Sequence, residues 1–281
     1  MHGPLAIVTD STAYLPPEAL SRHGIEAVPL TVVLGDRALE EGTEISARSL
    51  ATALRERRPV TTSRPSPEMF ARTYRAAAEA GAAGVVSLHL SAEFSGTYDA
   101  AVLAAAQSPV PVRVVDTGVV AMALGFCALA AAEAAEAGAS LDEAVAAAEK
   151  RAEGISAVFY VDTLDYLRRG GRIGAAQALL GSALAVKPLL EVADGRIGML
   201  EKVRTASKAI ARLEEIVVER AGDARVDIAV HHLAAADRAE QLAERFRARV
   251  PGLRELHVSE VGAVIGAHTG PGLLGAVLSL R

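Results

Sequence analysis

The sequence predicts an α/β protein of two domains, with a parallel sheet flanked by helices in the first and a mixed sheet in the second. Up to residue 154, short β-rich runs alternate with helical patterns, which is typical of parallel βαβ units. After residue 154, Asp194-Gly195 separates two apolar runs, and this dipeptide is a strong hairpin signal. The 281 residues are enough for two domains.

The first predicted domain covers residues 1–154. Ser66, Pro67 and Glu68 supply an N-cap, a proline at the first helical position and an early acid, which together mark the start of a helix. Ser140 and Glu143 form a capping box before an Ala-rich helix. The expected strands are 5–9, 27–34, 84–90 and 112–116, and the other expected helices are 17–23, 46–57, 96–107 and the apolar run 119–132.

The second predicted domain covers residues 155–281. A hairpin joined to helical crossovers implies a mixed sheet, and a cleft between two such domains is a natural place for a ligand. The expected elements are strand 155–161, hairpin 186–192 with 197–203, helix 205–221, strand 226–231, helix 235–250 and two late strands.

Composition limits the function classes. Only 4% of the residues are aromatic and there is no Trp, so a cavity would have aliphatic walls, which suit an alkyl chain better than a stacked nucleobase. The net charge of -5 is spread along the chain, which makes nucleic acid and anionic membranes poor partners. The lone Cys127 lies in an apolar run and is expected to be a buried hydrophobe.

The sequence also predicts a location. The first residues lack the basic segment and cleavage site of a signal peptide. The apolar run 119–132 is shorter than the roughly 20 residues that cross a bilayer. We therefore expect a cytoplasmic protein without a transmembrane segment, for which transient contact with a membrane surface stays open.

The first of three polar segments is the hydroxyl run Thr61-Thr62-Ser63. It precedes the helix that Ser66 caps, so these three hydroxyls are not needed for capping. They could bind a ligand, or they could belong to a polar surface loop.

The second segment, Ser95-Gly96-Thr97, joins a predicted strand to a predicted helix. Helix N-termini bind anions, Gly96 would allow close approach of a ligand, and both hydroxyls can donate. The alternative is that Ser95 only caps its own helix. The lysine and spacing of a nucleotide-binding P-loop are missing.

The third segment places His268 in a glycine-rich turn, where it could donate to a carboxylate and become cationic, or could simply be exposed. The adjacent His231 and His232 would point to opposite faces of a strand, so we expect no metal site and no cofactor. Arg168-Arg169-Gly-Gly-Arg172 could be a solvated surface, a carboxylate clamp or a docking element.

Taken together, these segments resemble the DegV family along nearly the whole chain. Each segment is modest evidence alone, but five in the right order are strong evidence. The segments that carry the resemblance are 8–16 (VTDSTAYLP), 61–67 (TTSRPSP), 95–98 (SGTY), 162–173 (DTLDYLRRGGRI) and 266–272 (GAHTGPG).

The resemblance implies a non-enzymatic carrier that encloses one long-chain fatty acid. It places the carboxylate against Thr62 and Ser95 with His268 nearby, and Arg172 with Arg169 near the entrance or a partner-docking face. In characterised members this is the fatty-acid-binding subunit of bacterial fatty acid kinase. A separate kinase subunit phosphorylates the bound acid to an acyl phosphate, a reaction of phospholipid metabolism.

Two residues depart from the family pattern. Arg64 stands where the family usually has Gln, and Glu93 precedes the Ser-Gly-Thr turn where small residues are common. Because an inward carboxylate would repel a bound carboxylate, we expect Glu93 to point outward.

Two other functions compete with the carrier. One is a stand-alone hydrolase or phosphotransferase that uses Asp10 and Ser11 at the end of the first strand, although no Gly-x-Ser-x-Gly elbow accompanies them. The other is a protein that binds a small anion or a sugar acid, which would need a short polar pocket.

Overall fold

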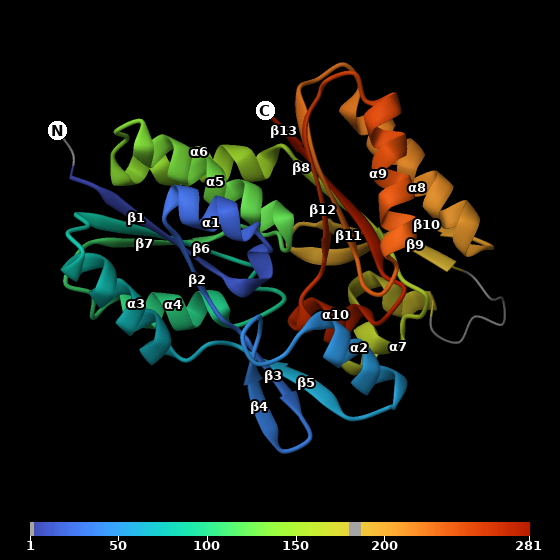
Figure 1. The fold of residues 1–281 in the computed structure, drawn as a ribbon, viewed down its shortest axis with the longest axis horizontal. Coiled ribbons are helices and arrows are strands. Elements are labelled where there is room, and N and C mark those ends of the chain that lie inside the picture. The colour runs from blue at the N-terminus through green and yellow to red at the C-terminus, as the bar shows by residue number, and fades with distance from the viewer. Residues whose placement is uncertain (1–2, 180–186) are drawn as a thin grey trace. The chain divides into compact units, whose positions relative to one another are not determined.

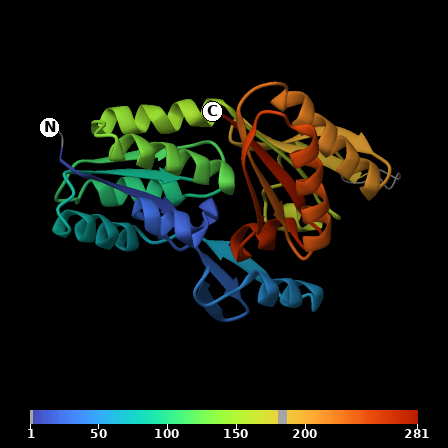
Figure 2. The same ribbon diagram turned by 45° about the horizontal axis from the view of Figure 1, so that its top comes forward.

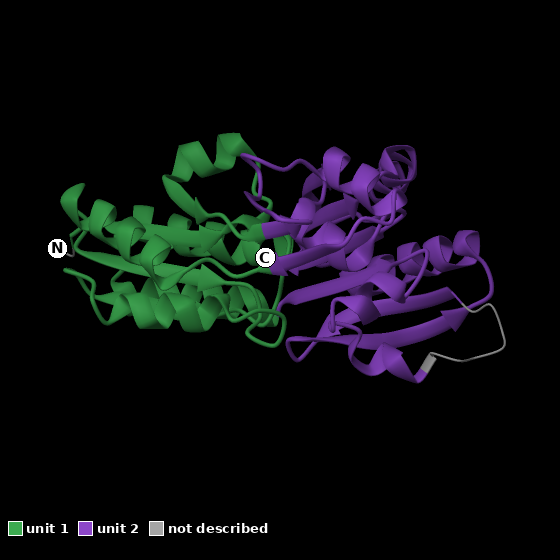
Figure 3. Ribbon diagram, turned by 90° about the horizontal axis from the view of Figure 1, so that it is seen from below, with its two compact units in different colours: residues 1–31, 63–153 green, residues 32–62, 154–281 purple. Residues whose placement is uncertain are grey.

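The computed structural model describes residues 3–179 and 187–281 (Figure 1). The chain divides into two compact units (Figure 3). Unit 1 contains Met1–Thr31 and Ser63–Glu153, and unit 2 contains Val32–Thr62 and Gly154–Arg281.

Unit 1 is built on a four-stranded parallel sheet in the order β2-β1-β6-β7. Helices cover both faces of this sheet (Figure 2): α5 and α6 pack on one face, and α3 and α4 pack on the other. The predicted fold class of this half is confirmed. The elements are β1 (Leu5–Asp10), η1 (Ser11–Ala13), α1 (Pro17–His23), β2 (Ile25–Val28), α3 (Pro67–Glu79), β6 (Gly84–His89), α4 (Thr97–Ala105), β7 (Val112–Asp116), α5 (Met122–Glu136) and α6 (Leu141–Glu153).

The helix starts of unit 1 follow the local sequence. The Ser66 side chain accepts a hydrogen bond from the Met69 N–H at the start of α3, with Pro67 in the first turn. Ser140 and Glu143 cap each other before α6. Each cap satisfies N–H groups that have no partner within the helix, so both predicted helix starts are confirmed.

Unit 2 contains a six-stranded mixed sheet in the order β10-β9-β8-β13-β11-β12. Among the described strands of this sheet, β11 and β12 pair in parallel and the other neighbours are antiparallel. The strands are β8 (Ile155–Tyr160), β9 (Lys187–Ala193), β10 (Arg196–Val203), β11 (Val226–His232), β12 (Leu253–Glu260) and β13 (Leu274–Leu280).

The predicted hairpin of unit 2 is confirmed. Asp194 and Gly195 both have positive φ (50° and 74°), as a two-residue turn that matches the strand twist requires. Val186, the first residue of the predicted strand, lies outside the described residues.

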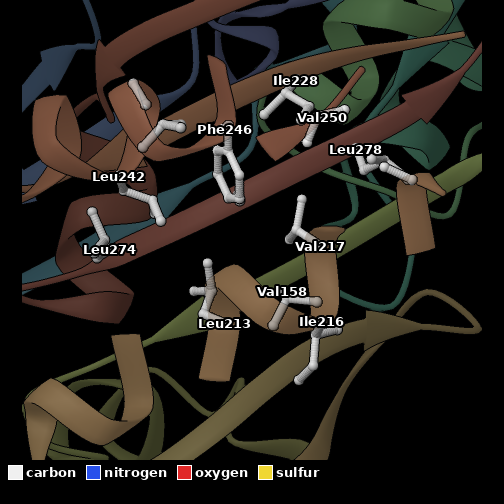
Figure 4. Packing of buried hydrophobic residues seen from close by; sticks show 14 of the residues in the cluster. Val158, Leu213, Ile216, Val217, Ile228, Leu242, Phe246, Val250, Leu274 and Leu278 are labelled. Carbon is white, nitrogen blue, oxygen red and sulfur yellow. The ribbon is translucent and has the colours of Figure 1, made fainter. Parts of the chain in front are cut away.

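Helices α8 (Ala206–Ala221) and α9 (Ala236–Arg249) pack on the six-stranded sheet and close its core (Figure 4). Phe246 of α9 and Leu213 of α8 are fully buried and pack in one cluster with Val158 of β8 and Leu274 of β13. This cluster removes a large apolar area from water, which is the main stabilising contribution to such a fold.

A small three-stranded sheet, β4-β3-β5, differs from the sequence prediction. Residues 27–34 were expected to form one strand, but Pro29 separates β2 from β3 and the two strands belong to different sheets. The two compact units divide between Glu153 and Gly154, close to the expected boundary, but residues 32–62 belong to unit 2 and not to the first unit. The new elements are β3 (Thr31–Leu34), β4 (Arg37–Glu40), α2 (Ala47–Arg55) and β5 (Val60–Ser63).

Three short helices of unit 2 lie together (Figure 1): α2, α7 (Asp165–Arg169) and α10 (Ala263–Thr269). Helix α10 packs on both of the others, although the three come from distant parts of the chain. A 3-10 turn, η2 (Gly174–Leu179), follows α7. Within the described residues, no helix combines the length and the apolar character that crossing a bilayer requires.

Candidate ligand-binding site

The third and first polar segments meet in unit 2. The Thr62 hydroxyl oxygen at the end of β5 lies 2.8 Å from Nε2 of His268 in α10, across 206 positions of sequence. Thr62 is half-buried, whereas its neighbours Thr61 and Ser63 are exposed. The strand alternation of β5 therefore selects one hydroxyl of the run for this contact.

The surroundings of His268 differ from the sequence prediction. The residue lies in the last turn of helix α10, not in a glycine-rich turn, which begins only at Gly270. Burial, together with the positive charge of Arg172, lowers the pKa of His268 to about 4. This lowered pKa favours the neutral imidazole at pH 7.

The hydrogen bonds of His268 favour one tautomer. Among the described residues, its buried Nδ1 has no hydrogen-bond partner. An orphaned buried N–H is rare and costly, so these contacts favour the tautomer that carries its proton on Nε2. Nε2–H then donates to Thr62, and the Thr62 hydroxyl hydrogen is left to donate to another acceptor. An anionic oxygen is the strongest such acceptor.

Gly170 leaves the space that the His268 ring occupies. A Cβ at Gly170 would lie 2.0 Å from Nδ1 of His268, although the backbone of Gly170 (φ -77°, ψ -7°) would suit any residue. The glycine is therefore required for space and not for its backbone conformation. Gly270 and Gly272 differ from Gly170, because both have positive φ (75° and 91°). A Cβ at Gly270 would also collide with the Tyr166 ring, and one at Gly272 with the Asp162 carboxylate.

Two arginines of the basic segment 168–172 make contacts within unit 2. Arg172 is half-buried and donates from Nη1 to the Gly170 carbonyl at 2.6 Å. Arg169 is exposed, and its guanidinium carbon lies 5.9 Å from the centre of the Tyr166 ring. Arg168 and Arg169 lie in the last turn of helix α7, and Arg172 follows the helix.

The second polar segment is described within unit 1. The Ser95 and Thr97 hydroxyls lie 2.8 Å apart, and the N-cap of α4 is Gly96, with no side-chain cap. The alternative that Ser95 only caps α4 is therefore wrong. A Cβ at Gly96 would meet the Arg64 guanidinium, which donates to the Gly96 carbonyl at 3.2 Å. Glu93 is exposed, as expected.

A buried carboxylate supports the loop that carries Ser95. Oδ1 of Asp10 accepts from Thr12, and Oδ2 accepts from the Leu90 N–H at 3.0 Å, where the loop leaves β6. Asp10 is fully buried. Both Asp10 oxygens are thus engaged by protein donors, and the Ser11 hydroxyl accepts from the Leu30 N–H. These contacts fit a structural role for Asp10.

Sequence reasoning missed the side chains that continue from Asp10. Nδ1 of His89 lies 3.1 Å from Asp10, Nε2 lies 2.8 Å from the Ser87 hydroxyl, and that hydroxyl lies 2.8 Å from the Tyr74 hydroxyl. The four side chains therefore form one continuous chain of hydrogen bonds, from Tyr74 through Ser87 and His89 to Asp10. Burial raises the Tyr74 pKa to about 12, which keeps this donor protonated. Ser87 and His89 could have been found as two polar residues on one face of an apolar strand.

Comparisons with known proteins agree with this architecture. The family model described as "Uncharacterised protein, DegV family" matches residues 4–281. A DegV domain-containing protein of Streptomyces coelicolor is 79% identical over 277 residues, which is 99% of each chain.

Two solved structures are also similar. A DegV family protein of Thermus thermophilus, described as fatty acid binding, has a TM-score of 0.94, 37% identity and coverage of 99% of this chain and 100% of its own. DegV of Bacillus subtilis, described as a fatty acid binding protein, has a TM-score of 0.92, 35% identity and the same coverage.

Proposed function

Because the chain belongs to the DegV family, we propose that it binds one long-chain fatty acid and holds the carboxylate on hydroxyl groups. The Thr62–His268 pair carries this proposal. Its neutral imidazole fixes the threonine oxygen and leaves the hydroxyl hydrogen to donate to an anion. The Ser95–Thr97 pair supplies further hydroxyl donors, and the fatty acid binding described for two solved relatives supports the choice of ligand.

The energetics of such a ligand suit a neutral site. Burial of an alkyl chain contributes about 0.8 kcal/mol per CH₂, so the chain can supply the affinity without a cationic partner. The carboxylate needs only enough hydrogen bonds to offset the loss of its hydration. Neutral donors can provide them, and the low aromatic content leaves aliphatic side chains to contact the alkyl chain.

We further propose that the protein presents this carboxylate to a separate fatty acid kinase. In the reaction, a carboxylate oxygen takes the γ-phosphoryl group of ATP, which yields an acyl phosphate and ADP. Hydroxyl donors neutralise the carboxylate less than a bidentate arginine would, so the oxygen stays nucleophilic. Because the partner uses ATP, we propose that the protein acts in the cytoplasm. Arg172 and Arg169 would lie near the entrance or the docking face.

Thr62→Val tests the carboxylate site, with Thr61→Val as the matched control. Both substitutions remove a hydroxyl at nearly constant shape, but Thr61 is exposed whereas Thr62 contacts His268. Loss of a hydrogen bond to a charged group should weaken oleic acid binding about tenfold in Thr62→Val. Isothermal titration of delipidated protein measures the affinity, and Thr61→Val should bind normally.

A double-mutant cycle with Ser95→Ala asks whether both hydroxyl pairs act on one ligand. Coupled losses of affinity would support a shared carboxylate. Unchanged binding in Thr62→Val, Ser95→Ala and the double variant would overturn the hydroxyl site. Denaturing mass spectrometry provides a separate check, because the purified wild type should release a fatty acid.

Presentation to a kinase is tested with the same variants. Delipidated protein loaded with oleic acid is incubated with a fatty acid kinase and ATP, and acyl phosphate is trapped with hydroxylamine. Thr62→Val loaded to saturation should still give a lower rate, because its carboxylate is no longer held in place. Equal rates at saturation would contradict a role for Thr62 in presentation.

A further inference from the structure

Glu41 is a buried carboxylate that the proposed carboxylate site does not contain. It lies just after β4, and only 5% of its surface is exposed. Charged side chains are almost never buried without a partner, and Oε1 of Glu41 accepts a hydrogen bond from the Val264 backbone N–H at 2.8 Å. The two residues are 223 positions apart in the chain.

This hydrogen bond supplies what the start of α10 lacks. The N-cap residue of α10 is Gly262, which has no side chain to cap the helix. The first N–H groups of a helix have no partner within it, and a carboxylate is a favoured acceptor for them. Glu41 therefore replaces a local cap with one from a distant segment.

Glu41 belongs to the segment 32–62, which contacts α10 at three positions along the helix. Glu41 binds the backbone at Val264, Leu50 of α2 packs against Gly266, and Thr62 hydrogen-bonds His268. A Cβ at Gly266 would lie only 2.6 Å from Leu50, so the glycine lets α2 and α10 approach closely. Movement of α10 along its axis would disturb all three contacts together.

We infer that Glu41 is a positioning residue, which fixes α10 so that His268 holds the Thr62 hydroxyl in its binding orientation. Glu41 acts through the helix and has no contact with the ligand in this scheme. The expected effect of Glu41 on fatty acid affinity rests on the proposed function. The effect on the His268 ring is independent of any ligand.

The test compares Glu41→Ala and Glu41→Gln with Glu40→Ala in the full chain. Glu40 is the adjacent, exposed glutamate, so it controls for loss of a carboxylate in this turn. Glutamine keeps an oxygen that can accept from Val264. The ¹⁵N chemical shifts of the His268 ring nitrogens report its hydrogen bond to Thr62 in ligand-free protein, and titration with oleic acid reports the affinity.

We expect Glu41→Ala to shift the His268 Nε2 resonance and to lower oleic acid affinity about tenfold, the equivalent of one lost cap or charged hydrogen bond. Glu41→Gln should retain the wild-type Nε2 resonance and the wild-type affinity, and Glu40→Ala should change neither. A folded Glu41→Ala protein with wild-type ring shifts would overturn the inference. A shifted ring with unchanged affinity would support the positioning role and contradict the proposed role of His268 in binding.

If Glu41→Ala does not fold, the inference is tested with Glu41→Gln alone. The Val264 amide proton should move, because an amide oxygen replaces a carboxylate oxygen as its acceptor, while the His268 ring shifts stay close to wild type. An unmoved Val264 proton would overturn the inference.

Discussion

Two histidines, one in each unit, have opposite kinds of surroundings. His89 of unit 1 is fully buried and has a partner at both ring nitrogens, Asp10 and Ser87. His268 of unit 2 is only partly buried, bonds Thr62 through one nitrogen, and has no partner at the other among the described residues. A closed network stabilises a fold, whereas a hydroxyl held by one neutral imidazole keeps a free donor for a ligand. His89 therefore serves the fold, whereas His268 is the histidine that we propose for ligand binding.

The largest expected effect comes from opening the closed network. Asp10→Ala would leave the Thr12 and Leu90 N–H groups and the His89 ring without their acceptor. Loss of one partner in a buried charged network costs about 3–5 kcal/mol, which urea denaturation measures as a fall in the free energy of unfolding. Asp142→Ala is the control, since its ion pair with Arg113 is exposed and should contribute at most about 1 kcal/mol. Equal losses in both variants would contradict the structural role of Asp10.

A smaller effect should follow from filling the space beside His268. Gly170→Ala places a Cβ against the imidazole, so the ring must move away from Thr62. Overpacking of this kind costs about 1–3 kcal/mol, and fatty acid affinity should fall with it. Gly198→Ala is the matched control, because its nearest neighbour would be at an ordinary 3.6 Å. Binding by Gly170→Ala at wild-type affinity would show that the ring position does not matter.

The smallest expected effect is on the pH dependence of stability. Burial lowers the pKa of His268 to about 4 from an ordinary value of 6.5, so between these values the unfolded chain binds more protons. The free energy of unfolding therefore falls as pH drops through this window. His268→Gln should reduce the loss by on the order of 1 kcal/mol, measured by urea denaturation at pH 7 and pH 4.5.

The fall should persist in part in this variant, because burial also lowers the pKa of His231 to about 4. An identical pH dependence in wild type and His268→Gln would show that burial does not lower the pKa of His268.

Local signals predicted the elements that depend on neighbouring residues. The caps at Ser66 and Ser140 and the turn at Asp194-Gly195 need only a few consecutive residues, and all three are present in the structure. The sequence predicts a glycine-rich turn where helix α10 forms, because Gly266, Gly270 and Gly272 lie close together. The helix forms because Glu41 caps it and Leu50 packs on it, and no local pattern contains either contact.

The sequence by itself determined the α/β class, most of the element order, and the hydroxyl and histidine residues that the proposed site uses. The class and the element order follow from periodicity and caps, and the site residues follow from polar segments that resemble those of the DegV family. All of these are properties of short stretches. Only the tertiary structure decided that residues 32–62 join unit 2, that Thr62 rather than Thr61 contacts His268, and that His268 is neutral. Each of these depends on burial and on contacts between segments about 200 residues apart, and desolvation by distant parts of the chain leaves no local trace.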